Sequence, residues 1–187
     1  MLILGIDTAT VQASCAIGGH EGVLAAVQSA KGRRHAENLA PSIRFACDLA
    51  GIDLAEISVV AVDLGPGLFT GLRVGIATAT SLAHALKVPM IGVPSLDLLA
   101  FPVRYSSRLI VAAIDARRGE LYWGCYRQGP GGGQRIGEHR GGSPPDVAPG
   151  HPNEHPTASV NYPAGVGNAG NNPTGPYLRN TNGQFTK

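Results

Sequence analysis

The sequence predicts an α/β fold in which one mixed, five-stranded sheet carries helices on its faces. Three short apolar or alternating segments come first, at residues 2–8, 13–18 and 23–29, and such a series is typical of an antiparallel meander. Two further apolar segments, at 58–64 and 89–93, have the continuous apolar character of strands that are covered on both faces. A meander followed by strand–helix units places both strand orientations in one sheet.

Helical periodicity predicts the elements between these strands. A helix over 37–50 is indicated by one apolar stripe, which consists of Leu39, Ile43, Ala46, Cys47 and Ala50. Gly51 is suited to ending this helix, because glycine tolerates the left-handed conformation found after the last turn. A long helix follows the glycine-rich loop at 65–71 and extends to about Lys87, and a short helix covers 95–101.

The composition of the chain changes after a predicted β-hairpin with strands at 108–114 and 120–126. Residues 128–187 are rich in glycine and proline, as in the segments GPGGGQ and GNAGNNPTGP, and contain few large apolar side chains. Such a stretch buries too little apolar surface to offset the entropy lost when its backbone becomes ordered. We therefore expect residues 128–187 to form a mostly disordered tail.

Charge and cysteine content exclude several classes of protein. The formal net charge is only +2, which is too small to indicate binding to nucleic acid or to a membrane surface. No apolar run approaches the length of about 18 residues that a membrane span needs, and the first residues lack the basic region of a secretory signal. Three widely spaced cysteines fit a reduced, cytoplasmic protein better than a disulfide framework or a zinc site.

The loop and helix at 64–87 are the most informative part of the sequence. A glycine-rich turn between a strand and a helix is either a tight connection or an anion site at the free N–H groups of the helix. A P-loop is excluded, because no Gly-Lys-Ser/Thr follows. Small residues recur along the helix at a spacing of four, at Gly71, Gly75, Ala79 and Ala83. This ridge permits close approach either of the protein's own sheet or of another helix.

Four segments resemble the TsaB (YeaZ) family: LILGIDTAT at 2–10, RRHAENLAP at 33–41, DLGPGLFTGLRVGIATA at 63–79 and IDARRGELYWG at 114–124. Members of this family are the dimerisation subunit of the bacterial machinery that makes N6-threonylcarbamoyladenosine in tRNA. The resemblance implies an actin-like, Hsp70-like architecture of two lobes.

In this sequence the resemblance assigns residues 1–105 to the first lobe and residues 106–127, with the hairpin, to the start of a second lobe. Residues 128–187 do not resemble the rest of that lobe, so we expect the second lobe to be truncated.

The family comparison also bears on metal binding. The larger paralogue in the pathway, TsaD, binds its metal through an HxxxH pair, in which two histidines share one face of a helix. The matching positions here are His35 and Leu39. One histidine makes a poor metal site, so we expect no bound metal and interpret His35 as a surface or capping residue.

Nucleotide binding is supported only weakly. Actin-like ATPases hold metal and phosphate with a strand-borne aspartate and a following turn, a role for which Asp7, Thr8 and Thr10 are the candidates here. Ala9 occupies the turn where such enzymes usually carry glycine. We therefore expect Asp7, and Asp115 at the equivalent position of the hairpin, to bond to nearby backbone. No catalytic residue is assigned.

The leading hypothesis is a non-catalytic scaffold that pairs with a TsaD-like catalytic subunit, in which ATP and a metal ion are expected. A TsaE-like ATPase is a further expected partner, and a homodimer is the other possible pairing. We expect tRNA to contact the chain only indirectly. The predicted partner interface comprises six small or apolar residues on the two long helices: Gly71, Gly75, Ala79, Ala83, Ile43 and Cys47. The alternatives are an actin-superfamily ATPase or small-molecule kinase, and a non-functional truncated fragment.

Overall fold

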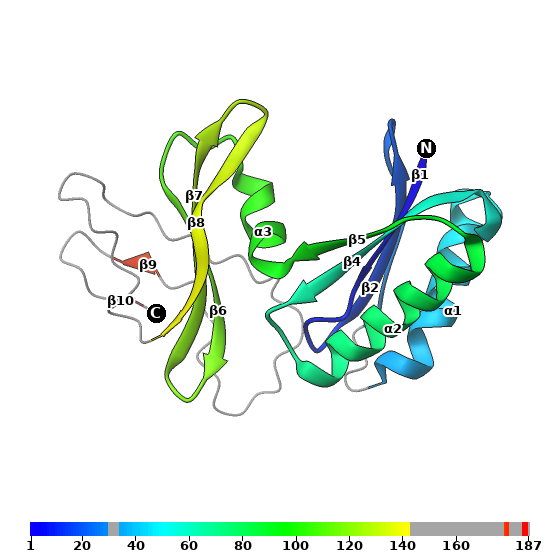
Figure 1. Cartoon of the computed structure of the whole chain (residues 1–187), viewed down its shortest axis with the longest axis horizontal. Coiled ribbons are helices and arrows are strands. Elements are labelled where there is room, and N and C mark those ends of the chain that lie inside the picture. Colours follow the sequence, from blue (N-terminus) through cyan, green and yellow to red (C-terminus); the bar gives the residue numbers. More distant parts are fainter. Residues whose placement is uncertain (30–33, 143–177, 180–184, 187) are drawn as a thin grey trace. The chain divides into compact units, whose positions relative to one another are not determined.

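The computed structural model describes residues 1–29, 34–142, 178–179 and 185–186, and the chain divides into two units, Met1–Ser95 and Leu96–Lys187 (Figure 1). The first unit therefore ends before residue 105, where the sequence predicted the end of the first lobe. The reason lies in helix α3 (Ser95–Ala100), whose side chains Leu96 and Ala100 belong to the core of the second unit.

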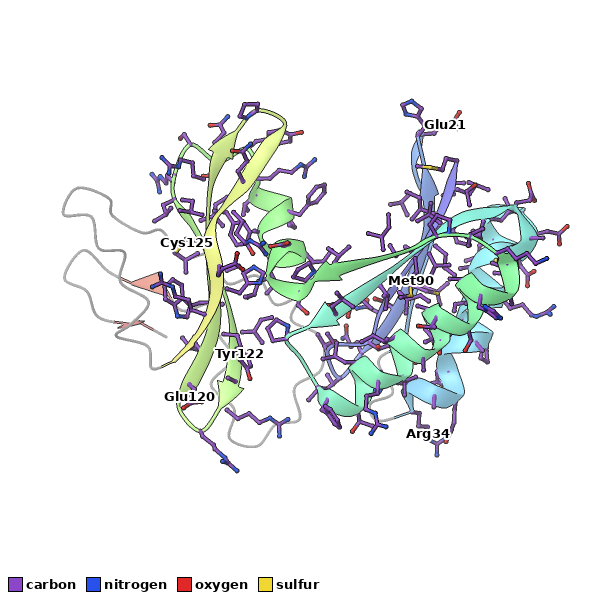
Figure 2. All side chains as sticks on the ribbon, viewed as in Figure 1. Glu21, Arg34, Met90, Glu120, Tyr122 and Cys125 are labelled. Atoms are coloured by element: carbon purple, nitrogen blue, oxygen red, sulfur yellow. The ribbon has the colours of Figure 1, made fainter. Side chains whose placement is uncertain are left out.

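The first unit is built on a five-stranded sheet with the strand order β3-β2-β1-β4-β5. Its strands are β1 (Leu2–Asp7), β2 (Ala13–Gly19), β3 (Gly22–Ser29), β4 (Ile57–Gly65) and β5 (Met90–Pro94). The first three form an antiparallel meander, whereas β4 runs parallel to both β1 and β5. This is the mixed five-stranded sheet that the sequence predicts. Figure 2 shows Glu21 at the tip of the β2–β3 hairpin and Met90 on β5.

Two helices, α1 (His35–Ala50) and α2 (Phe69–Leu86), lie side by side against this sheet (Figure 1). Helix α1 packs against β2 and β3, and α2 packs mainly against β4. A short 3₁₀ helix, η1 (Leu54–Glu56), leads into β4. None of the helices in the described ranges is long and apolar enough to cross a membrane.

The core of the first unit lies between the sheet and these two helices. Strand positions that alternate along β1 and β2 point into it, so that Leu4, Ile6 and Ile17 are almost fully buried. Leu39 and Ile43 cover them from α1, as the apolar stripe of that helix predicts. Gly51 ends α1 in the left-handed conformation, with φ of 66°, which also agrees with the sequence.

The second unit contains a three-stranded antiparallel sheet with the order β6-β7-β8. Its strands are β6 (Ile110–Arg117), β7 (Glu120–Gly129) and β8 (Gly132–Gly142). Helix α3 and the 3₁₀ helix η2 (Phe101–Val103) contribute Leu96, Ala100 and Val103 to the core, which Ile110 and Tyr126 complete. Glu120 lies at the β6–β7 turn (Figure 2).

The expected boundary of the disordered tail at residue 128 is wrong. Residues 128 and 129 belong to β7, and 132–142 form all of β8, which pairs with β7 from Leu121↔Gly142 to Gly129↔Gly132. A ladder of backbone hydrogen bonds supports this glycine-rich strand, although it carries few apolar side chains. Two short strands, β9 (Leu178–Arg179) and β10 (Phe185–Thr186), also pair. The remaining residues of the expected tail lie outside the described ranges.

Candidate functional site

The candidate nucleotide-binding residues form a turn after β1 whose polar groups are bonded within the protein. The carboxylate of Asp7 accepts a hydrogen bond from the backbone N–H of Ala9 at 2.9 Å, as expected from the sequence. The hydroxyl of Thr8 is buried and donates to the carbonyl of Gly71 at 2.8 Å. The hydroxyl of Thr10 accepts from the N–H of Gln12 at 3.1 Å. The turn is thus held by its own backbone and by the start of α2.

The glycine-rich loop packs directly on this turn. The N–H of Leu68 donates to the carbonyl of Ala9 at 2.7 Å, so it is not free to bind an anion. A Cβ atom at Gly67 would lie 2.5 Å from the Ala9 carbonyl oxygen, and one at Gly71 would lie 2.1 Å from the Thr8 carbonyl oxygen. Both contacts are far shorter than van der Waals distance. Glycine at these positions therefore permits the close packing of α2 on β1, which favours the tight-connection interpretation over an anion site.

The predicted partner interface is wrong, because its residues face the interior of the first unit. Ala79 has no exposed surface, and a Cβ atom at Gly75 would lie 2.2 Å from the Thr8 hydroxyl oxygen. All six residues of that prediction are buried: Gly71, Gly75, Ala79, Ala83, Ile43 and Cys47. The ridge of small residues serves the approach of α2 to its own sheet, which is the other alternative that the sequence left open.

His35 and Leu39 do not fit a metal ion. The side chain of Leu39 is almost completely buried in the core, and the imidazole Nε2 of His35 lies 2.9 Å from the carbonyl oxygen of Thr10. The interpretation of His35 as a surface or capping residue, however, is wrong. His35 is 8% exposed and joins the first turn of α1 to the turn after β1. Within the described residues, no group of three or more His, Cys, Asp or Glu side chains is placed to hold a metal ion.

A buried carboxyl group, Asp63, was missed by the sequence interpretation. Asp63 stands one residue beyond Val62, which pairs with Ile6 of the parallel strand β1, so Asp63 and Asp7 lie at the same edge of the sheet. Its carboxylate accepts hydrogen bonds from the Ser95 hydroxyl at 2.6 Å and from the Gly65 N–H at 2.7 Å.

The environment of Asp63 disfavours its charge. Burial raises the pKa of Asp63 to about 6; the nearby Asp7 also raises it, and the bonds from Ser95 and Gly65 oppose the rise. The detectable signal in the sequence is an acidic residue near the carboxyl end of each of two adjacent parallel strands, since such residues meet near one edge of a sheet.

The second unit holds a separate polar cluster around Asp97 of α3. The Tyr126 hydroxyl on β7 donates to the Asp97 carboxylate at 2.7 Å, and His139 Nε2 on β8 lies 3.1 Å from the same oxygen. Arg135 lies 3.8 Å from the other carboxylate oxygen. Burial and the bond to Asp97 raise the pKa of Tyr126. This cluster joins α3 to β7 and β8. Elsewhere in the unit, Asp115 accepts from the N–H of Arg117 at 2.7 Å, as expected.

Comparison with known proteins places the chain among relatives of bacterial tRNA-modifying proteins. A family model described as "TsaD: tRNA N6-adenosine threonylcarbamoyltransferase" matches residues 22–140. An uncharacterized protein of Mycobacterium leprae is 42% identical over 153 residues, which cover 80% of this chain and 41% of that protein. The tRNA threonylcarbamoyladenosine biosynthesis protein TsaB of Escherichia coli is 37% identical over 134 residues, which cover 71% of this chain and 58% of TsaB.

The structural comparison agrees with the sequence comparison. The solved structure of YeaZ from Pseudomonas aeruginosa aligns with a TM-score of 0.72 at 34% identity, covering 80% of this chain and 70% of YeaZ. By contrast, the chain spans only 41% and 58% of the lengths of the two curated relatives from Mycobacterium leprae and Escherichia coli. The range that the family model matches contains the glycine-rich loop and the β6–β7 hairpin. On these grounds, the chain belongs to the TsaB (YeaZ) family.

Proposed function

We propose that the chain is a non-catalytic subunit in the formation of N6-threonylcarbamoyladenosine in tRNA and that it supports a TsaD-like catalytic partner. The TsaB relative of Escherichia coli and the matching family are both described by their part in making this modification, which supports the pathway. The observation that supports the non-catalytic role is that the polar groups of the turn after β1 form hydrogen bonds within the protein. The Ala9 carbonyl and the Thr8 hydroxyl both bond to the loop and first turn of α2.

A phosphate-binding loop needs free N–H groups and room for close approach of the ligand. Here the N–H groups of Ala9 and Leu68 donate within the protein, and α2 occupies the space beside Thr8. We propose accordingly that the partner, and not this chain, holds ATP and the metal ion of the reaction.

The partner surface is proposed on the outward faces of α1 and α2, since their inward faces are buried in the unit. Helix α2 exposes short side chains, Ala77 and Ser81, one turn apart, and α1 exposes the short side chain of Ala40. Short outward side chains on two neighbouring helices permit close packing of helices from a related lobe. The same faces would serve the homodimer, and a TsaE-like ATPase is proposed to join the assembled complex.

Co-purification with a TsaD-like protein tests this proposal, with Ala77→Arg as the disrupting variant. Ala77 is exposed, so the variant should fold with an unchanged circular dichroism spectrum. The bulk and charge of arginine should weaken partner binding by about tenfold or more if the site is energetically important. Ala26→Arg is the matched control, because Ala26 is an alanine on β3, away from both helices' outward faces. Binding by Ala77→Arg at the parental level would refute the proposed interface, and no partner binding by the parent would refute the scaffold role.

One observation favours a second function, an actin-superfamily ATPase or small-molecule kinase. The parallel pairing of β1 with β4 places Asp7 and Asp63 near the carboxyl ends of neighbouring strands. Two carboxylates at the carboxyl edge of a parallel sheet suit Mg²⁺–phosphate chemistry. Calorimetry with MgATP distinguishes this candidate from the scaffold. Stoichiometric binding that Asp7→Asn abolishes would support the enzyme. A first unit without cooperative unfolding would instead favour the non-functional fragment.

A further inference from the structure

We propose that the second unit carries a direct RNA-binding surface around Arg104, with exposed aromatic rings for bases and arginines for phosphates. We call it the Arg104 surface and define it by Phe101, Arg104, Tyr105 and Arg135. The RNA chemistry is argued from this surface itself, whereas the identity of the RNA as tRNA rests on the function proposed above. A direct contact would go beyond the indirect role for tRNA expected from the sequence.

Charge is distributed unevenly along the chain, which the small net charge conceals. Residues 96–142 contain seven arginines and no lysine against four acidic residues, an excess of three positive charges. Asp97 lies near Arg135. Within the described residues, no ion pair at 4.0 Å or less involves Arg104 or Arg127. Guanidinium groups without carboxylate partners are suited to bidentate contacts with phosphate oxygens.

Two exposed aromatic rings flank Arg104. Its guanidinium carbon lies 3.8 Å from the centre of the Phe101 ring and 4.5 Å from that of Tyr105, and one of its N–H groups donates to the Phe101 carbonyl at 2.9 Å. The two residues are nevertheless 59% and 63% exposed. Stacking on the guanidinium therefore holds both rings in place while leaving much of each ring open to solvent.

The β7–β8 hairpin extends the surface. Cβ atoms at Gly132 and Gly133 would lie 3.3 Å and 3.2 Å from side-chain atoms of Arg104, so the hairpin tip packs against that side chain. Arg135 follows on the adjoining part of the ladder, where it pairs with Tyr126, whereas Arg127 pairs with Gln134 and projects from the opposite face. Arg104 and its two rings thus lie against the hairpin tip, and Arg135 projects from the same face of the β7–β8 ladder as Gly133, which Arg104 contacts.

This combination favours single-stranded RNA over a protein partner. Unpaired bases stack on aromatic rings and on guanidinium planes, and flanking arginines neutralise the phosphates. Aromatic residues and arginine are also enriched in protein interfaces, so charge is what favours RNA here: residues 96–142 carry an excess of three positive charges, and in the described part of the chain Arg104 forms no ion pair. The pairing of two open rings with Arg104, which has no ion pair within the described residues, matches a polyanion with exposed bases.

Fluorescence anisotropy of the full chain tests the proposal, with two labelled probes: an unmodified tRNA transcript and a blunt RNA duplex of equal length. The surface should bind the transcript more tightly, because its loops present unstacked bases. Tyr105→Ala should weaken transcript binding by about tenfold and should leave the salt dependence almost unchanged. Arg104→Ala should weaken binding similarly and also lower the slope of log K against log salt by about 0.7–0.9.

Controls separate this surface from general charge and from misfolding. Arg73→Ala removes an arginine that lies 5.3 Å from the exposed ring of Phe69 in the first unit, and it should bind like the parent. Tyr105→Phe keeps the ring and should retain binding. Trp123 fluorescence checks that each variant keeps the second unit folded.

Equal binding of both probes, or parental binding by Tyr105→Ala and Arg104→Ala, would overturn the proposal. So would a loss of TsaD-like partner binding in these variants without any change in RNA binding, which would identify a protein interface. RNA binding that persists when the parent fails to bind a TsaD-like partner would support the Arg104 surface and contradict only the scaffold function.

Discussion

Removing the charge of Asp63 should stabilise the first unit at neutral pH. Asp63 is 4% exposed, and its folded-state pKa of about 6 stands above the ordinary value of 3.8. The folded state therefore binds this proton more tightly than the unfolded state does. The resulting stability is fully present below about pH 3.8 and is lost as pH rises through about 6. The difference corresponds to about 3 kcal/mol.

The informative variant is Asp63→Asn. Its amide oxygen can still accept hydrogen bonds from the Ser95 hydroxyl and the Gly65 N–H, but it carries no charge. At pH 8 the variant should be more stable than the parent by up to about 3 kcal/mol. At pH 4 the two proteins should differ little, because the parental carboxyl group is then mostly protonated when folded. Since Asp7 contributes to the shift, the parental titration belongs to the pair.

Urea unfolding followed by circular dichroism at 222 nm measures this difference, because α1 and α2 are the long helices of the first unit. The single tryptophan, Trp123, reports separately on the second unit. Asp115→Asn is the matched control: its carboxylate also accepts a backbone N–H, at 2.7 Å, but the residue is exposed. A loss of stability in Asp63→Asn that is equal at pH 4 and pH 8 would refute the argument, since the charge would then carry no burial penalty.

Three further substitutions test the packing described above. Gly71→Ala should destabilise the first unit by about 1–3 kcal/mol in urea unfolding, because its Cβ atom would meet the Thr8 carbonyl oxygen at 2.1 Å. This clash should outweigh the gain in helix propensity of about 1 kcal/mol. A gain in stability would contradict the prediction. Ala79→Arg should lower the stability of the first unit by about 3–5 kcal/mol, because Ala79 is fully buried. A folded variant with an unchanged thermal midpoint would show instead that the small residues of α2 face solvent. Tyr126→Phe removes a hydroxyl that bonds to Asp97 at 2.7 Å. Loss of a bond to a charged group should lower stability by about 1–3 kcal/mol, measured by Trp123 fluorescence, and no change would show that the cluster does not stabilise the second unit.

The order of elements up to residue 126 could be predicted from the sequence because it depends on local periodicity. Apolar residues at a spacing of two or of three to four mark strands and helices before any long-range contact forms. The same local signals predicted the end of α1 at Gly51 and the mixed sheet. Strand β8 escaped prediction because Ile136 is its only large apolar residue, and pairing with β7 supports it instead.

The direction in which a helix face points is decided only by tertiary structure. The spacing of Gly71, Gly75, Ala79 and Ala83 shows that they share a face. Close packing against a sheet and close packing against a partner helix both require small residues on that face. The fold resolves this choice, because the Thr8 carbonyl lies where a side chain at Gly71 would stand. Asp63 and Ser95 likewise meet only after α2 and β5 have brought residues 32 positions apart into hydrogen-bonding distance. Local patterns encode which residues are buried, whereas the neighbour that buries them depends on contacts between segments distant in the sequence.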